Sequence, residues 1–183
     1  MPNHCINEII FRNVDVAAQE AILAKVRNQD GEIDFGVLVP KPLNLWDGGV
    51  GSLHEKKFRQ TGLDWARENW GTKWNAYGID EGCKYQSIAQ GDDTLTLTFQ
   101  TAWGPPYPWI AALFNFFQRP IEHNWLDEGE SRGHSGTFDY QQYVKGFGGW
   151  DEVDADDAMQ KHLHKLLWGV EEFPDEPDDE AAA

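Results

Sequence analysis

The chain has 183 residues and a mass of 20.8 kDa, which suits one domain with an embellishment or a domain with a small appendage. Its formal net charge is −16, so phosphate backbones and anionic membrane surfaces should repel it at neutral pH. Direct binding to nucleic acid or to membranes is therefore not expected. The expected partners are basic surfaces, including those of proteins that themselves bind nucleic acid.

The cysteine content and the first residues predict a cytoplasmic protein. Cys5 and Cys83 are the only cysteines, too few for a disulfide framework, and we expect both to be small buried residues. The opening residues lack the basic segment and apolar run of a secretory signal. No window approaches the roughly 20 apolar residues that span a bilayer. We expect a reducing compartment, the cytoplasm of a host cell.

The first third of the chain predicts strand and helix, followed by an irregular stretch. In order, we expect a strand at 4–11, a helix at 16–27 that Asp15 caps, an extended run at 31–40 and a long loop from 40 to about 62. The helix carries apolar residues at three- and four-residue spacing, which makes one apolar stripe. Such a helix needs a sheet to cover.

The middle third contains the clearest hairpin. In order, we expect a helix at 63–70 between Thr61 and Gly71, a strand at 74–79, hairpin strands at 83–89 and 94–101, a helix at 108–117 and a strand at 121–126. Residues 94–99 alternate strictly between threonine and apolar side chains, so one face of the sheet must be buried.

This order predicts an α+β fold: a ferredoxin-like split βαβ antiparallel sheet with both helices on one face and the opposite face open. We expect a ferredoxin-like domain at 1–128, with a loop-plus-helix insertion at about 40–72. A C-terminal extension at 129–170 should hold a turn at 129–136, an edge strand at 137–143, a break at 146–150 and a helix at 154–168. Residues 171–183 form an acidic tail, expected to be disordered or ordered only in a complex.

Two aromatic stretches, residues 68–77 and 99–106, have a composition that a simple connection does not need. Two interpretations stay open. In the structural one, Trp70, Trp74 and Trp103 fill the space between insertion and sheet, and Asn75 bonds the backbone. In the functional one, Lys73 and Asn75 project from an aromatic shelf and hold a ligand by cation–π and amide contacts.

The same stretches resemble a known family. Met-Pro-Asn-His-Cys before a strand, Glu-Asn-Trp-Gly-Thr-Lys-Trp-Asn-Ala-Tyr, and Phe-Gln-Thr-Ala-Trp-Gly-Pro-Pro before a helix resemble the YubB-like family of ferredoxin-like proteins, which phages and conjugative plasmids carry. The resemblance covers roughly residues 1–128, and the C-terminal third departs from it. It implies a fold and a mobile-element origin, and it supplies no catalytic residues.

No residue pattern predicts an enzyme, a metal site or a cofactor. His162 and His164 lie two apart, so on a helix they point in different directions. The other histidines lack ligand spacing, and neither a Gly-x-Ser-x-Gly elbow nor a phosphate-cradling loop is present. A threonine-lined sheet face and the acidic charge also argue against an RNA-binding module.

Acidic residues gather toward the C-terminus. They are Asp151, Glu152, Asp154, Asp156 and Asp157, followed by the acidic tail. One interpretation is a solubilising surface. The other is a mimic of nucleic-acid phosphates that occupies a basic groove on a host protein. We favour a non-enzymatic accessory protein of this second kind, which binds and inhibits a host defence or transcription protein. The alternative is a small-molecule or nucleotide-binding enzyme that uses the aromatic shelf at residues 70–77.

Overall fold

One antiparallel sheet organises the molecule. The computed structural model describes residues 3–49, 51–78, 86–138 and 150–171. Within these residues the strands are β1 (His4–Arg12), β2 (Ser87–Gln90), β3 (Thr94–Ala102), β4 (Ile121–Asp127), β5 (His134–Phe138) and β6 (Trp150–Asp154). They lie in the order β2-β3-β1-β4-β5-β6, and every neighbouring pair is antiparallel.

The first four strands have the ferredoxin-like order. β1 lies between β3 and β4, and the β2–β3 hairpin places β2 at one edge. Ile9 of β1 faces Leu97 of β3 and His123 of β4, so residues far apart in sequence share one side of the sheet. The predicted α+β class and split βαβ arrangement are confirmed. β5 and β6 then extend the same sheet beyond β4.

Helices cover one face of the sheet. The helices of the described residues are α1 (Val16–Val26), α2 (Phe35–Leu38), α3 (Ser52–Lys57), α4 (Gly62–Asn69), α5 (Tyr107–Phe117) and α7 (Asp157–Trp168). Apolar residues of α1 and α5 form the main core with Ile9 and Phe11 of β1. Phe35 of α2 joins this core, where its ring centroid lies 4.4 Å from that of Trp109. None of the described helices is long and apolar enough to cross a membrane.

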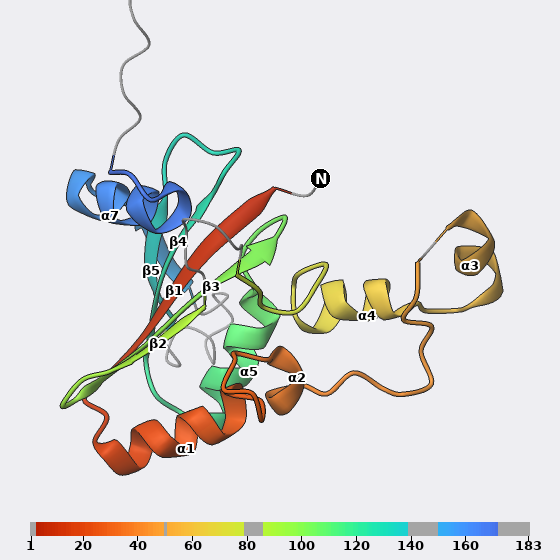
Figure 1. Cartoon of the computed structure of the whole chain (residues 1–183), viewed down its shortest axis with the longest axis horizontal. Coiled ribbons are helices and arrows are strands. Elements are labelled where there is room, and N and C mark those ends of the chain that lie inside the picture. Colours follow the sequence, from red (N-terminus) through yellow and green to blue (C-terminus); the bar gives the residue numbers. More distant parts are fainter. Residues whose placement is uncertain (1–2, 50, 79–85, 139–149, 172–183) are drawn as a thin grey trace, which may run out of the picture.

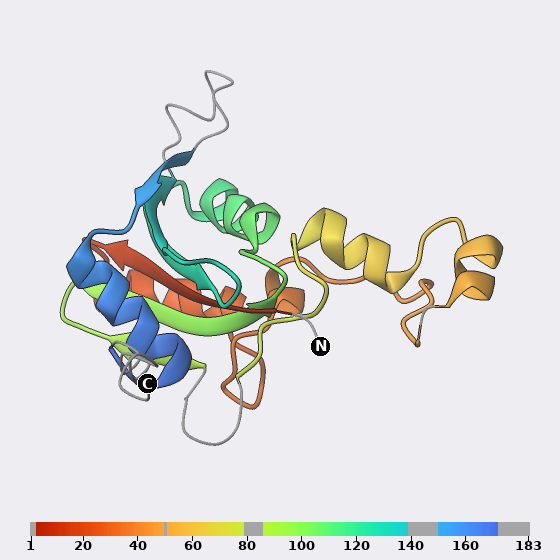
Figure 2. The same ribbon diagram turned by 90° about the horizontal axis from the view of Figure 1, so that it is seen from above.

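The opposite face of the sheet is only partly open, contrary to expectation. α7 lies on that face, on the other side of the sheet from α5 (Figure 2). Leu163 and Leu167 of α7 form a second, smaller core with Ile6 and Leu126 of the sheet. The predicted docking of this helix is confirmed, and its site is the threonine-bearing face. Thr98, expected to line an open surface, is consequently buried.

Several local predictions were wrong. The apolar run at 31–40 contains the short helix α2, because the Asp34 carboxylate caps it by accepting from the backbone N–H of Gly36 at 2.7 Å. Residues 74–78, the described part of the strand predicted at 74–79, form no strand, and Tyr77 makes a single bridge to Gln100. Trp150 begins β6 where a break was expected, and α7 starts at Asp157, three residues later than predicted. The strand predicted at 137–143 starts earlier, at His134 of β5, and it is not an edge strand, because β6 pairs with its outer side. The acidic tail beyond residue 171, residues 83–85 of the hairpin with Cys83, and residues 139–143 lie outside the described residues.

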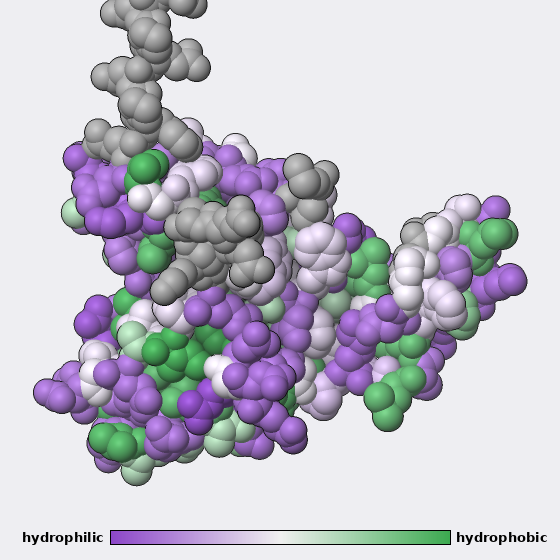
Figure 3. Space-filling view, in the orientation of Figure 1, coloured by the Kyte–Doolittle hydropathy of each residue, from purple (hydrophilic) through white to green (hydrophobic). Residues whose placement is uncertain are grey.

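The insertion forms an arm. We use this name for residues 41–69, which contain α3 and α4 and extend away from the sheet (Figure 1). The loop expected from 40 to 62 therefore contains a helix, α3. Apolar side chains reach the surface of the arm (Figure 3), among them Leu43, Leu53 and Phe58.

Candidate functional site

The largest of the described cavities lies where the arm joins the body. Its volume is about 630 Å³. Four of the five predicted shelf residues line it, namely Trp70, Lys73, Trp74 and Asn75. The lining also includes Gly36, Lys41, Asp47, Gly48, Gly49, Gly62 and Leu63. Two segments that are separate in sequence, the loop after α2 and the loop after α4, thus share one hollow.

Trp70 is a fixed wall of this cavity. Its side chain is buried, and its Nε1 donates a hydrogen bond to the backbone oxygen of Val39 at 2.9 Å. The rings of Phe35 and Trp65 meet it edge-on at 5.9 and 5.3 Å. A buried indole whose N–H has a partner is a stable packing unit. Trp70 therefore follows the structural interpretation and also shapes the cavity.

Gly71 sets the position of the aromatic stretch that follows. Its φ is +86°, a left-handed conformation that glycine adopts without a steric penalty. A Cβ at this position would lie 2.5 Å from Cδ of Pro108, at the start of α5. The predicted C-cap is confirmed, and the close approach brings the Lys73 loop against the body.

Asn75 is committed to the backbone. Its Oδ1 accepts hydrogen bonds from the N–H groups of Phe35 at 2.8 Å and Ala76 at 2.9 Å. Its Nδ2 donates to Oδ1 of Asp34 at 2.6 Å. These bonds tie the start of α2 to the aromatic stretch, as the structural interpretation of Asn75 expects.

Lys73 and Trp74 are the accessible part of the shelf. The Lys73 ammonium lies 4.7 Å from the centroid of the Trp74 ring, and that ring is 44% exposed. Lys41, which the sequence pattern did not single out, lies 5.1 Å from the Trp70 ring and 2.6 Å from Oδ1 of Asp47. The cavity thus presents two ammonium groups, each against an indole. The only local signal for Lys41 was its place between two prolines in a glycine-rich loop.

Trp103 does not join this cavity. It follows β3 with a φ of +75°, its N–H donates to the backbone oxygen of Asn3, and its side chain is exposed. It is absent from the cavity lining. The structure therefore separates Trp103 from the three other predicted shelf residues that flank Lys73.

The predicted acidic residues occupy β6 and the beginning of α7, and they do not share one role. Asp151 and Asp154 are exposed on β6. Asp156 caps α7 by accepting from the backbone N–H of Met159 at 2.8 Å. Asp157, 90% exposed at its side chain, pairs with Arg132 at 3.3 Å. Four of the five carboxylates therefore reach solvent at this edge.

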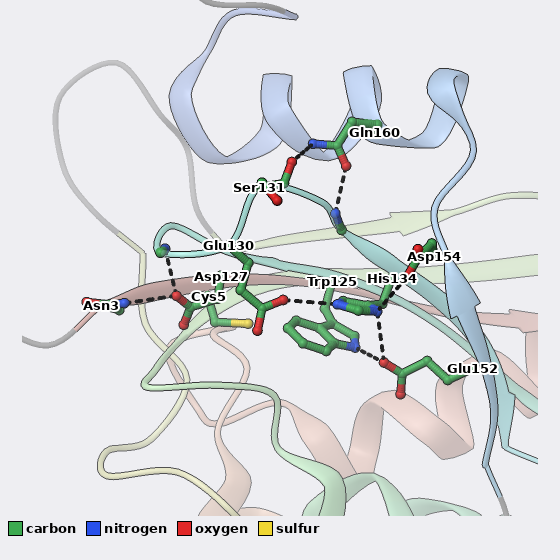
Figure 4. A network of polar contacts seen from close by, with 12 residues as sticks. Asn3, Cys5, Trp125, Asp127, Glu130, Ser131, His134, Glu152, Asp154 and Gln160 are labelled. Atoms are coloured by element: carbon green, nitrogen blue, oxygen red, sulfur yellow. Dashed lines mark hydrogen bonds and ion pairs between the residues drawn. The ribbon is translucent and has the colours of Figure 1, made fainter.

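Glu152 is the exception, because it points into a polar network (Figure 4). Its carboxylate accepts from the Tyr107 hydroxyl at 2.8 Å and from Trp125 Nε1 at 3.0 Å. His134 stacks on Trp125 with ring centroids 4.3 Å apart, and its Nδ1 lies 3.5 Å from Glu152. Its Nε2 lies 3.0 Å from Glu130. Glu152 thus fastens β6 to α5 and β4 and offers little to a partner.

Buried polar groups continue from this network along the helix-covered face. Asn7 donates to Thr101 Oγ1 at 2.8 Å, and its Oδ1 lies 3.0 Å from His123 Nε2. Burial raises the pKa of the Cys5 thiol. Burial also lowers the pKa of His123 to about 3, and the neutral form is the one present at neutral pH. An activated thiolate needs the opposite shift at Cys5.

Burial also shifts the pKa values of Tyr77 and Tyr107, two tyrosines near these buried polar groups, and both values move upward. Burial raises the pKa of Tyr77, and burial together with the hydrogen bond to Glu152 raises the pKa of Tyr107. Both hydroxyls therefore serve as neutral donors. Among the described residues, no group of three or more His, Cys, Asp or Glu side chains is placed to hold a metal ion.

A family model described as "Ferredoxin-like domain in Api92-like protein" matches residues 69–162, just over half of the chain. The searches of curated proteins and of solved structures found no match to the chain. The matched range begins at the aromatic stretch and includes β5 and β6, so it extends past residue 128, where the resemblance found in the sequence ends. The chain therefore belongs to the family of the ferredoxin-like domain in Api92-like protein.

Proposed function

We propose that this chain is a non-enzymatic accessory protein of a phage or conjugative plasmid, and that it binds a basic host protein. The partner is one that handles nucleic acid, and the bound chain blocks its nucleic-acid groove. The exposed carboxylates of β6 and the start of α7 carry this proposal. The mobile-element setting rests on the sequence resemblance to the YubB-like family.

The charge of this region supports an interaction with a basic surface. Residues 151–180 hold 12 of the 31 acidic residues and only two lysines. Within it, Asp151, Asp154, Asp156 and Asp157 are exposed over seven consecutive positions. Hydrophilic side chains dominate the outer surface of α7 (Figure 3). A groove that binds phosphates presents Lys and Arg, and a row of carboxylates gives it a complementary potential.

Neutralising these four carboxylates tests the proposal. The variant is Asp151→Asn, Asp154→Asn, Asp156→Asn and Asp157→Asn, because asparagine at position 156 still caps α7. A matched control neutralises four exposed carboxylates elsewhere: Asp30→Asn, Asp92→Asn, Asp93→Asn and Glu128→Gln. Both variants carry the same net charge.

The measurement has two steps. Host proteins captured on the wild-type chain are identified, purified and titrated with each variant at several salt concentrations. We expect the β6–α7 variant to bind at least tenfold more weakly than the control variant, and wild-type binding to weaken as salt rises. Duplex DNA should compete with the chain for the captured protein. If both variants lose the same affinity for the host protein, net charge alone explains the effect and the proposal is wrong. If neither variant loses affinity, the interface lies elsewhere on the chain.

A further inference from the structure

We propose that the cavity at the base of the arm binds a small molecule with a planar aromatic ring and an anionic group. Mononucleotides and aromatic carboxylic acids share this chemistry. The inference does not depend on the acidic surface, which belongs to β6 and α7, because the cavity is built by α2, the arm and residues 70–75.

The dimensions suit a ligand of this size. A volume of about 630 Å³ lies in the usual range of small-molecule sites, about 300–1,000 Å³. Its wall on the body side is fixed, since Trp70 bonds Val39 and Asn75 bonds Phe35 and Asp34. A preformed pocket avoids the ordering cost that a flexible one must meet on binding.

Two lysines make the cavity a site for an anion. Among the residues that the structure describes, Lys73 has no carboxylate within ion-pair distance, whereas Lys41 shares its charge with Asp47. In a chain of net charge −16, a lining with two lysines and one aspartate carries a net positive charge, which is a local reversal of sign. Gly49 leaves open space where a side chain would otherwise stand. A ligand anion can therefore reach Lys73 without displacing a carboxylate from it.

Trp74 supplies the surface for the ring. Its indole is 44% exposed, and Tyr77 meets it edge-on at 6.1 Å, which steadies its orientation. Aromatic rings associate by offset stacking or edge contacts, and such pairs contribute about 0.5–1.5 kcal/mol beyond area burial. Since the Lys73 ammonium lies over the same indole, 4.7 Å from its centroid, a molecule bound against this indole can contact both the ring and the charge.

The test is calorimetric titration of the full chain at low salt with four probes. Adenosine monophosphate and indole-3-acetate carry both ring and anion, adenosine carries the ring alone, and inorganic phosphate carries the anion alone. The variants are Lys73→Gln, which removes the charge, and Lys73→Arg, which keeps it. Lys25→Gln is the matched control, because Lys25 lies 5.0 Å from the Phe116 ring, outside the cavity lining.

We expect at least one of the two ring-plus-anion probes to bind at least tenfold more tightly than adenosine and phosphate. Lys73→Gln should weaken that binding about tenfold or more, Lys73→Arg should retain it within about threefold, and Lys25→Gln should leave it unchanged. Which probe binds identifies a phosphate or a carboxylate as the anion. If no probe binds, if phosphate alone binds as tightly, or if Lys25→Gln has the effect of Lys73→Gln, the proposal is wrong. Unchanged thermal unfolding of Lys73→Gln separates loss of binding from loss of fold.

Discussion

Two histidines on opposite faces of the sheet have pKa values shifted in opposite directions: the pKa of His162 is raised and that of His123 is lowered. His162 of α7 lies 2.8 Å from Glu8 Oε1, and this hydrogen bond raises the pKa of His162 despite partial burial. Burial alone would raise the pKa of Glu8, but hydrogen bonds from His162 and Asn124 outweigh it and lower that pKa. His123, by contrast, is fully buried and stays neutral.

Replacing His162 by glutamine tests the first pair. A raised folded-state pKa gives stability that is present below about 6.5, the unfolded value, and is lost as pH rises through the folded pKa. The lowered pKa of Glu8 gives stability above about 4.5 that is lost as pH falls. The ion pair therefore stabilises most between about pH 4.5 and 6.5. Because the His162 side chain is 43% exposed, we expect a loss of about 1 kcal/mol or less near pH 5.5.

Urea unfolding at pH 5.5 and 8.5 gives the measurement. The difference between wild type and His162→Gln should shrink at the higher pH. Leu53→Ala, a change on the arm at an exposed residue that does not titrate, is the control and should show no such trend. A constant difference at both pH values would mean that the contact is a neutral hydrogen bond.

Replacing His123 by glutamine tests the second histidine. Burial lowers the pKa of His123 to about 3, so below about pH 6.5 the unfolded chain binds a proton that the folded chain does not. Stability must then fall with acid, by about 2–3 kcal/mol at pH 4.5 from this group alone. Glutamine can still bond Asn7 but does not titrate. Urea unfolding at pH 7.0 and 4.5 should show a smaller drop for the variant, and an equal drop would contradict a neutral buried imidazole.

At the scale of single elements, α3 depends on one aromatic stack. The Trp46 ring stacks with His54, with ring centroids 4.7 Å apart, and with Phe58, with ring centroids 5.7 Å apart. A helix of six residues is far below the roughly 12–15 that an isolated helix needs in water. The stack therefore supplies the tertiary contact that α3 needs.

Trp46→Ala should unfold α3 locally. We expect the amide hydrogens of residues 52–58 to exchange faster, while global unfolding by urea changes by less than about 1 kcal/mol, because the arm extends from the body. Leu53→Ala is the control, since that side chain is 68% exposed on the same helix. A comparable fall in global stability would show that the arm is part of the main cooperative unit.

Elements with a strong local period were predictable. The alternation in β3, the cap at Asp15 and the glycine at 71 keep their predicted roles. Thr61, which was predicted to precede a helix, caps that helix. The helix α2 was not predictable, because three apolar residues and a glycine fit a strand as well as a helix, and only Asp34 and Asn75 decide between them. β6 was missed because charged residues dominate a short edge strand.

The site was predictable only in part. Trp70, Lys73, Trp74 and Asn75 are adjacent in sequence, so their convergence on one cavity follows from local spacing. Lys41 and Asp47 arrive through the arm loop, and no local pattern encodes that approach. The buried contact between Asn7 and His123 was missed for the same reason. The two residues are far apart in sequence, and only the β1–β4 register brings them together.

At the scale of the whole molecule, charge is divided between two ends. Residues 41–73 contain six of the 15 Lys and Arg residues and four acidic ones, whereas residues 151–171, where the described part of the C-terminal region ends, hold six of the 31 acidic residues and two lysines. The arm and α7 lie at opposite ends of the molecule (Figure 1). The basic residues of the arm are therefore too far away to neutralise the acidic edge within one chain.

This separation predicts that salt will act on folding and on binding with opposite signs. A net charge of −16 destabilises the compact state by self-repulsion, which dissolved salt screens. Raising sodium chloride from about 10 to 300 mM, across which the Debye length falls from about 30 Å to below 10 Å, should raise the urea midpoint at pH 7.5 and weaken binding to a basic partner.

The variant neutralised at Asp151, Asp154, Asp156 and Asp157 should show a smaller rise in the urea midpoint than wild type, because the removed charges are close together. The control variant, neutralised at dispersed positions, should keep more of the salt dependence. A midpoint that falls with salt would mean that attraction between the arm and the body outweighs repulsion, and the charges would then be arranged for stability rather than for a partner.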